Sequence, residues 1–289
     1  MSNYQVRSYE DTYTIYELTD ASTDSVVRVC PERGGIVIGC QLHGLELFYL
    51  DRDTFIHPTA NIRGGNPVLF PICAQLKDAQ YTWKGVTYPM ANHGVARTSK
   101  WDVLGTSTEG EASITIALRS NETTRQSYPF DFELIFTYAL VDGKLDIRQQ
   151  YTNTGSGEAM PFYAGFHPYF NTDTKKIAYE IDATRYLDLN DNNEYPYEGV
   201  IDLTGKVESL TLLDAKTPSV SFPVSGGAKV TMSYDPIFKY VVVWHVEGKP
   251  FICVEPWMAS TGELNRQEEL VMLDAGQSLN ANLTISCDR

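Results

Sequence analysis

Cysteine is scarce in this sequence and follows no pairing pattern. The chain has 289 residues and five cysteines, Cys30, Cys40, Cys73, Cys253 and Cys287. Their number is odd, their spacing is wide, and no Cys-x-x-Cys pair occurs. These features argue against a disulfide framework and against a zinc site. Most of these cysteines lie in apolar runs, where a free thiol packs as a small hydrophobic side chain.

Positive charge is also in deficit. Lys and Arg number 23 against 37 Asp and Glu, so the formal net charge is −14. Such an acidic surface repels phosphate backbones and anionic lipid headgroups, which argues against nucleic acid and membrane partners. No apolar run approaches the roughly 20 residues that span a bilayer, and the N-terminus shows no secretion-signal pattern. We therefore expect a cytoplasmic protein.

The motifs of several enzyme classes are missing. The sequence has neither a Gly-rich phosphate loop of the P-loop or dinucleotide type nor a Gly-x-Ser-x-Gly nucleophile pattern. Its histidines lack a metal-ligand spacing such as His-Glu-x-x-His. The sequence thus predicts no metal ion and no cofactor. For His43, His57 and His245 we expect surface or packing roles.

Short runs rich in Val, Ile, Thr, Tyr and Phe, separated by turn residues, recur along the chain. They favour a pleated, half-buried surface, and their spacing predicts an all-β fold, a large antiparallel β-sandwich. No linker or change in composition divides the chain, so residues 1–289 are expected to form a single domain. The predicted strands are Val26–Val29, Gly35–Cys40, Leu45–Leu50, Ser113–Arg119, Phe132–Tyr138, Leu145–Tyr151, Lys229–Tyr234, Tyr240–Trp244, Phe251–Glu255 and Asn280–Ile285.

Turn residues agree with this assignment. Three dipeptides that end in glycine predict hairpins, namely Asp142-Gly143, Lys84-Gly85 and His43-Gly44. No long stretch shows helical periodicity. Short helices are expected at Thr123–Ser127 and Ser209–Ala215, and a polar loop at Thr184–Lys206.

Two motifs combine glycine with arginine or histidine. In Arg63–Pro67 (Arg-Gly-Gly-Asn-Pro), the glycines would let the backbone and the guanidinium approach a ligand closely. Taken alone, this motif is better explained as a turn before a buried strand. His93–Arg97 (His-Gly-Val-Ala-Arg) suggests a ligand-facing loop, although a structural histidine explains it equally well.

Two further motifs place a titratable side chain among apolar residues. In Gly165–Phe170 (Gly-Phe-His-Pro-Tyr-Phe), His167 stands between aromatics and before a proline, which restricts its backbone. An ordinary histidine pKa lets it give and take a proton near neutral pH, but a core histidine is slightly favoured here.

In Phe251–Trp257 (Phe-Ile-Cys-Val-Glu-Pro-Trp), Glu255 ends an apolar strand. Burial would raise its pKa toward the range that a general base needs. A structural role would require a partner for the buried charge, so the functional interpretation is favoured. Trp257 offers a flat face for a sugar ring.

Together, in this order along the chain, the four motifs resemble those of the aldose 1-epimerase (galactose mutarotase-like) superfamily. They run from Arg63 to Trp257 and so cover most of the chain. The Arg-Gly-Gly and Glu-Pro-Trp forms are closer to the branch that contains glucose-6-phosphate 1-epimerases than to the galactose mutarotases proper. The resemblance implies the galactose mutarotase-like supersandwich fold.

The resemblance also implies roles for individual residues. Glu255 matches the glutamate that acts as general base on the C1 hydroxyl, and His167 the histidine that protonates the ring oxygen. His93 matches a second histidine that binds or polarises the sugar near that oxygen. Arg63 matches a substrate-binding arginine, and Arg97 closes the second motif, where it contacts the substrate or braces the site.

The sequence departs from the family pattern at two places. Val95 replaces an aromatic residue of the second motif, which changes packing more than chemistry. The family usually places a sugar-binding aspartate between the third and fourth motifs, and in residues 207–214 the candidate stand-in is Asp214. This second departure bears mainly on the identity of the substrate.

The implied reaction interconverts the two anomers of a sugar without a cofactor. A base removes the C1 hydroxyl proton while an acid protonates the ring oxygen, the ring opens, and the aldehyde rotates and recloses on its other face. A glutamate and a histidine with pKa values near neutrality suit these roles. The expected partner is a hexose or a hexose phosphate, and the expected assembly is a monomer or weak homodimer.

Other functions remain open. A phosphosugar enzyme, such as a glucose-6-phosphate 1-epimerase, would use Arg63 and Arg97 to bind the phosphate. A non-catalytic carbohydrate-binding protein needs no acid–base pair, so the joint presence of His93, His167 and Glu255 argues against it. A protein that shares only the fold ranks last.

Overall fold

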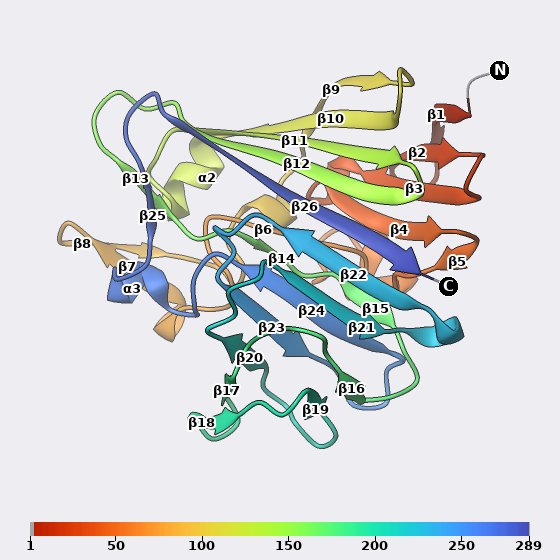
Figure 1. Ribbon diagram of the computed structural model, residues 1–289. Helices are drawn as coiled ribbons and strands as arrows, with labels where there is room; N and C mark the ends of the chain where they lie inside the picture. Colours follow the sequence, from red (N-terminus) through yellow and green to blue (C-terminus); the bar gives the residue numbers. More distant parts are fainter. Residues whose placement is uncertain (1–2, 289) are drawn as a thin grey trace.

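The computed structural model describes residues 3–288, and antiparallel strands dominate this part of the chain (Figure 1). The N-terminal sheet has five strands in chain order and packs against two strands of a larger sheet, β10 and β11. Its strands are β1 (Tyr4–Glu10), β2 (Thr14–Asp20), β3 (Ser25–Cys30), β4 (Ile36–Leu42) and β5 (Leu45–Glu46).

The larger sheet has seven strands in the order β21-β22-β26-β12-β11-β10-β9. Alternation along β11 explains how it packs, because Phe132, Leu134 and Phe136 are buried while the residues between them are only half-buried. The strands are β9 (Asp102–Ser107), β10 (Ala112–Arg119), β11 (Phe132–Val141), β12 (Lys144–Asn153), β21 (Ser219–Pro223), β22 (Lys229–Tyr234) and β26 (Ser278–Asp288).

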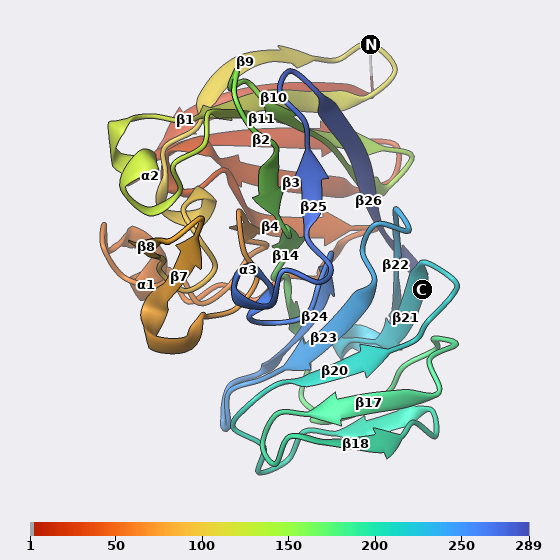
Figure 2. The same cartoon turned by 90° about the vertical axis from the view of Figure 1, so that its left-hand side faces the viewer.

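The third sheet carries the candidate site and occupies the lower part of Figure 1 and Figure 2. Its order is β18-β17-β20-β23-β24-β14-β6, and β15 also pairs with β24. The strands are β6 (Val68–Leu69), β14 (Gly165–Phe166), β15 (Tyr169–Asn171), β17 (Arg185–Asp188), β18 (Asn193–Pro196), β20 (Leu210–Leu213), β23 (Tyr240–Trp244) and β24 (Phe251–Trp257).

The remaining elements are short. Three strand pairs stand apart from the large sheets: β7 (Gln80–Trp83) with β8 (Val86–Pro89), β13 (Met160–Phe162) with β25 (Val271–Leu273), and β16 (Lys176–Ala178) with β19 (Val200–Asp202). The α-helices are α1 (Arg52–Ile56), α2 (Glu122–Ser127) and α3 (Glu263–Arg266). Single turns of 3₁₀ helix occur at Pro31–Arg33, Lys77–Ala79, Ala96–Thr98 and Ser225–Gly227. Within residues 3–288, the helices are all too short to cross a membrane.

Strand β24 is central to the third sheet, and all seven of its residues are buried. Ile252 and Val254 belong to the main hydrophobic cluster, whereas Phe251 and Cys253 belong to a smaller one. Since side chains alternate across a strand, Glu255 shares the face of Cys253. The strand thus closes the core with one face and presents a carboxylate on the other.

The all-β sandwich prediction is confirmed, and so are the three hairpin turns and the helix at Thr123–Ser127. The predicted strand at Leu45–Leu50 is largely wrong, because β5 ends at Glu46 and only isolated bridges follow. The main hydrophobic cluster takes in residues from Leu18 to Cys287, and the single domain of residues 1–289 stays a prediction.

The predicted helix at Ser209–Ala215 is wrong. This segment forms β20, which pairs with β17 on one side and with β23 on the other. Leu210 and Leu212 are buried in the main cluster, so sheet pairing and burial override the local preference. The predicted loop at Thr184–Lys206 is also partly wrong, because it contains β17, β18 and β19.

Candidate active site

A cavity of about 500 Å³ opens on the face of the third sheet that carries Glu255. It brings together six of the seven residues singled out in the sequence: Arg63, His93, Arg97, His167, Glu255 and Trp257. The other lining residues are Asn61, Ala74, Gln75, Leu76, Lys77, Asn92, Tyr169, Leu189, Asn192, Glu208, Ser209, Val242, Trp244 and Thr261. They come from segments distant in sequence, which the pairing of β14, β15 and β23 with β24 brings to one place.

Two titratable side chains meet in this cavity. Nε2 of His167 lies 3.4 Å from Oε1 of Glu255, and the two side chains are only 8% and 2% exposed. The second carboxylate oxygen of Glu255 accepts a hydrogen bond of 3.1 Å from the indole N–H of Trp257, two residues along the same strand. Alternation along β24 therefore aims the carboxylate and its donor into the same space.

Aromatic packing surrounds the ring of His167. Tyr169 stacks on it nearly in parallel, with ring centroids 4.8 Å apart and planes inclined by 14°. His93 and Trp244 meet it edge-on, at 5.1 Å and 5.8 Å. Its Nδ1 atom is buried and has no partner with hydrogen-bond geometry within residues 3–288. Ring contacts, rather than a hydrogen bond to Nδ1, hold the imidazole in place.

His93 is held by hydrogen bonds instead. The ring Nδ1 of His93 accepts a hydrogen bond from the backbone N–H of Ala74 at 3.0 Å. The backbone N–H of His93 donates to the carbonyl of Ala74 at 2.8 Å. A neutral His93 therefore carries its proton on Nε2. Burial, followed by electrostatic interactions with His167, Arg97 and Arg63, lowers the pKa of His93 well below its ordinary value. The residue is thus a neutral N–H donor that lines the cavity.

The surroundings push the pKa values of the acid–base pair apart. Burial raises the pKa of Glu255 well above its ordinary value, against the opposing effects of the Trp257 hydrogen bond and the Arg97 charge. Burial and then Arg97 lower the pKa of His167 to about 3. Both directions disfavour the charged form, of the carboxylate in one case and of the imidazolium in the other.

Two arginines add positive charge to the cavity. The guanidinium of Arg63 lies over the ring of Trp244, 5.1 Å from its centroid, and Arg97 donates to the side-chain carbonyl of Asn61. Among the described residues, neither guanidinium is within ion-pair distance of a carboxylate. Arg33, also near Arg97, is buried against backbone carbonyls, including those of His57 and Pro58.

The glycines of the first two motifs have a structural use. A Cβ on Gly64 would lie 2.5 Å from Cα of Leu50, and one on Gly94 would lie 2.2 Å from the carbonyl oxygen of Phe70. Both glycines also have positive φ angles, 140° and 78°. They permit close approach to the protein's own backbone and so fix the neighbouring Arg63 and His93.

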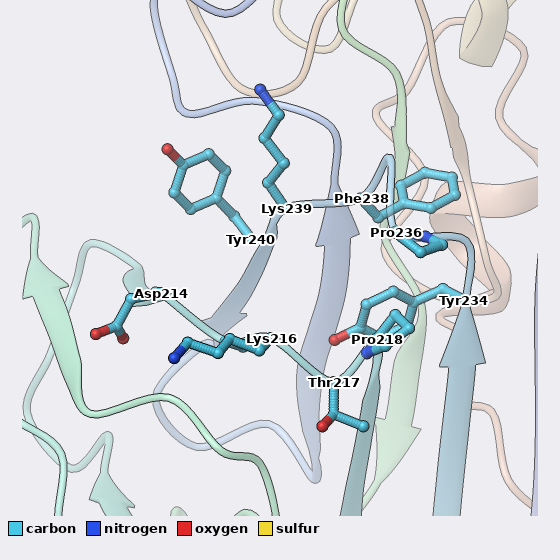
Figure 3. A pocket seen from close by; sticks show the side chains of 10 residues that line it. Asp214, Lys216, Thr217, Pro218, Tyr234, Pro236, Phe238, Lys239 and Tyr240 are labelled. Carbon is cyan, nitrogen blue, oxygen red and sulfur yellow. The ribbon is translucent and has the colours of Figure 1, made fainter.

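Asp214 is the one predicted site residue that the structure places elsewhere. It lies after β20 and lines a different cavity of about 240 Å³, with residues such as Lys216 and Tyr240 (Figure 3). Its carboxylate accepts hydrogen bonds from the backbone and hydroxyl of Thr184 and lies 3.6 Å from Arg185. The structure thus places Asp214 outside the cavity that holds Glu255, and its carboxylate links β17 with the end of β20.

Three of the other lining residues have side chains suited to binding a sugar, and none of them was singled out in the sequence. Glu208, in the expected stretch 207–214, is the carboxylate of that stretch that lines the cavity. Tyr169 follows His167 by two residues within its motif. Trp244 shares a strand face with Val242, which also lines the cavity. The motif around His167 could have indicated Tyr169, and strand alternation could have indicated Trp244. No sequence pattern indicates the exposed Glu208 as a cavity residue.

One group of described residues has donor atoms suited to a metal ion: His167, Cys253 and Glu255, all within 4.8 Å of one another. Burial raises the pKa of the Cys253 thiol well above its ordinary value, which opposes the thiolate that a metal requires. The nearby guanidinium groups also disfavour a cation. These three side chains therefore fit a metal ion poorly, and the absence of a metal stays a prediction.

Comparisons with known proteins match this chain to one family model and to several relatives and solved structures. The aldose 1-epimerase family model matches residues 16–286. The Slr1438 protein from Synechocystis sp. PCC 6803 is 32% identical, with a TM-score of 0.91 over 100% of this chain and 98% of that one. A galactose mutarotase related enzyme from Lactobacillus acidophilus shares the fold, at 23% identity and a TM-score of 0.77 over 99% and 98% of the two chains. Protein LacX (chromosomal) of Lactococcus lactis subsp. lactis is 24% identical over 67% of this chain and 73% of its own length.

Proposed function

This chain belongs to the aldose 1-epimerase family, and we propose that it interconverts the α and β anomers of an aldose by acid–base opening and closure of the ring. The observation that carries the proposal is the contact of 3.4 Å between Nε2 of His167 and Oε1 of Glu255 inside a cavity. A single buried donor or acceptor would serve binding equally well. An adjacent acid and base are what proton transfer at both C1–OH and the ring oxygen requires.

In the proposed reaction, Glu255 takes the proton of the C1 hydroxyl while His167 gives a proton to the ring oxygen, so the C1–O5 bond breaks. The aldehyde rotates about C1–C2 and recloses, and the two residues exchange roles. His93 donates its Nε2–H near the ring oxygen. The proton count is unchanged over the cycle, so no external acid or base is needed.

Burial favours the neutral forms of Glu255 and His167, whereas ring opening starts with an ionised Glu255 and a protonated His167. Sugar hydroxyls that hydrogen-bond to the carboxylate favour its ionised form and oppose the effect of burial. The proton then resides on the imidazole, 3.4 Å away. Substrate binding thus prepares the reactive ionisation state.

The rest of the sugar meets aromatic and polar groups. Trp257, Trp244 and Tyr169 present apolar ring surface to the cavity. Glu208, exposed at the cavity rim, takes the place of the aspartate that the family usually provides and accepts hydrogen bonds from hydroxyls remote from C1.

A phosphosugar is the second candidate substrate. The observation that favours it is the pair of guanidinium groups, Arg63 and Arg97, that lack a carboxylate partner within residues 3–288. Arginine forks bind phosphate oxygens in bidentate fashion, and Lys77 adds a third cation to the lining. In a chain of net charge −14, this local excess of positive charge suits an anionic ligand.

The experiment that tests the function follows a freshly dissolved single anomer by polarimetry or NMR, over a panel of free and phosphorylated hexoses. We expect the purified protein to speed equilibration of at least one of them. Binding without acceleration of any sugar would show instead a carbohydrate-binding protein.

A further inference from the structure

One side of the cavity is a short segment, residues 206–209, that precedes β20. Glu208 and Ser209 line the cavity from it, and the side chain of Glu208 is exposed. None of the four residues of the segment belongs to a strand, so no sheet ladder holds Glu208 in place. Four side chains from neighbouring elements contact this segment instead, those of Asp188, Asn190, Trp244 and His245.

Asn190 makes the largest number of these contacts. Its Oδ1 accepts the backbone N–H groups of Val207 and Glu208, both at 2.9 Å. Its Nδ2 donates to the carbonyl of Glu208 at 3.1 Å and to Oδ1 of Asp188 at 2.7 Å. Both lone pairs and both N–H groups of the amide are therefore used. Asp188 is buried and accepts a hydrogen bond from the ammonium group of Lys206. The contacts of Asn190 with the segment, called the Asn190 brace below, are therefore held in place by a fixed neighbour.

The other side of the segment is fixed through Trp244. The indole N–H donates to the carbonyl of Val207 at 3.0 Å. The same ring lies beneath the guanidinium of Arg63 and edge-on to His167, so this contact connects the segment to the acid–base pair. Asn190 has no such connection, because it lies outside the set of cavity-lining residues.

We infer that Asn190 is a positioning residue that holds Glu208 in place for the sugar and so sets affinity without entering the chemistry. The inference rests on the proposed function, and it assigns to Asn190 a role in the affinity for the substrate. A side chain held ready by its backbone loses less freedom on binding, so releasing the segment weakens ground-state and transition-state binding alike. A loss of this kind raises KM and leaves kcat unchanged.

The test compares Asn190→Ala with the wild type and with Asn193→Ala, a control in the neighbouring strand β18. Asn193 is exposed, and its backbone N–H bonds to Asp191 rather than to the segment. We expect Asn190→Ala to raise KM about three- to tenfold, the size of one or two lost hydrogen bonds, while kcat and its pH profile stay unchanged. Asn193→Ala should behave as wild type.

A double variant decides whether Asn190 acts through Glu208. In a Glu208→Ala background, Asn190→Ala should change KM no further, because the group that it positions is already absent. An undiminished effect in that background, or a fall in kcat instead of a rise in KM, would overturn the inference.

Amide hydrogen exchange provides a readout that needs neither substrate nor a stable variant. In the wild type, the backbone N–H groups of Val207 and Glu208 should exchange slowly although they belong to no strand. Exchange at the rate of a free loop would show that the side chain of Asn190 does not hold them. If no sugar is turned over but these amides are protected, the proposed function fails while the brace stands. If sugar is turned over and Asn190→Ala has no effect on KM, the positioning role alone fails.

Discussion

The phenol ring of Tyr169 lies almost parallel to the imidazole of His167, with 4.8 Å between the ring centroids. The stack takes the place of the hydrogen bond that the buried Nδ1 of His167 lacks among the described residues. Tyr169 is itself fixed, since it opens β15 opposite Cys253 of β24, two residues before Glu255. The backbone pairing that places the carboxylate thus also places the ring that orients its partner.

The first prediction concerns this stack. Tyr169→Phe retains the aromatic face and should keep kcat within about threefold of wild type, whereas Tyr169→Leu should lower kcat by about 10- to 100-fold, because a misplaced catalytic group costs that much. Anomer equilibration of both variants measures the difference, and thermal unfolding checks that both are folded. Equal rates for the two variants would show that the stack does not orient His167.

The second prediction concerns the acid–base pair itself. Glu255→Gln and His167→Asn should each lower the equilibration rate by about 10²- to 10⁴-fold, the usual contribution of a positioned proton donor or acceptor. Sugar binding, measured by calorimetry, should survive in both variants. A variant that equilibrates anomers at nearly the wild-type rate would remove that residue from the mechanism.

The third prediction is a dependence of stability on pH. The pKa of His167 is about 3 in the folded protein, below the ordinary value of 6.5, so protons bind more tightly to the unfolded chain. The stabilising contribution is therefore complete above pH 6.5 and is lost as the pH falls toward 3. Between pH 7.5 and pH 5, wild type should lose about 2 kcal/mol more than His167→Asn in urea unfolding. An equal loss of unfolding free energy in both proteins would show that His167 does not cause the acid sensitivity.

The fourth prediction separates the two substrate classes. If a phosphosugar is the substrate, Arg97→Gln should raise KM for it at least about tenfold and change KM for the free hexose little, because hydrogen bonds between charged groups are the strong ones. Arg185→Gln, an exposed arginine paired with Glu194, is the matched control. Equal effects of Arg97→Gln on the KM of both sugars would show that Arg97 does not bind the phosphate. It would then contact the part that the two sugars share, or stabilise the fold.

The fifth prediction uses two glycines with similar backbone angles. Gly85 and Gly94 have φ of 82° and 78°, but a Cβ on Gly85 meets no atom within 4 Å, whereas one on Gly94 meets the Phe70 carbonyl oxygen at 2.2 Å. Gly85→Ala should cost about 1 kcal/mol of unfolding free energy, from backbone strain alone. Gly94→Ala should cost about 1–3 kcal/mol more, from overpacking, and should also lower activity by displacing His93. Equal losses in urea unfolding would contradict the assigned clash.

Local sequence was sufficient for those features that depend on near neighbours. Apolar and alternating runs predicted ten strands, of which nine are present, and the dipeptides ending in glycine predicted the turns. Side-chain alternation and positive φ are properties of a few adjacent residues, so local sequence is enough to indicate them. The four motifs likewise identified six residues that line the cavity. In each motif, neighbouring glycine, proline or strand residues fix the backbone at the functional side chain.

Tertiary structure alone decided what depends on pairing between distant segments. Leu210–Leu213 is apolar enough for helix or strand, and only its burial between β17 and β23 makes it a strand. The same pairing turned Asp214 away from the cavity and left Glu208 at its rim. The contact of His167 with Glu255, and the pKa values that follow from it, exist because β14, β15 and β24 are neighbours in one sheet. Burial and proximity are properties of the assembled sheet, and no local pattern encodes them.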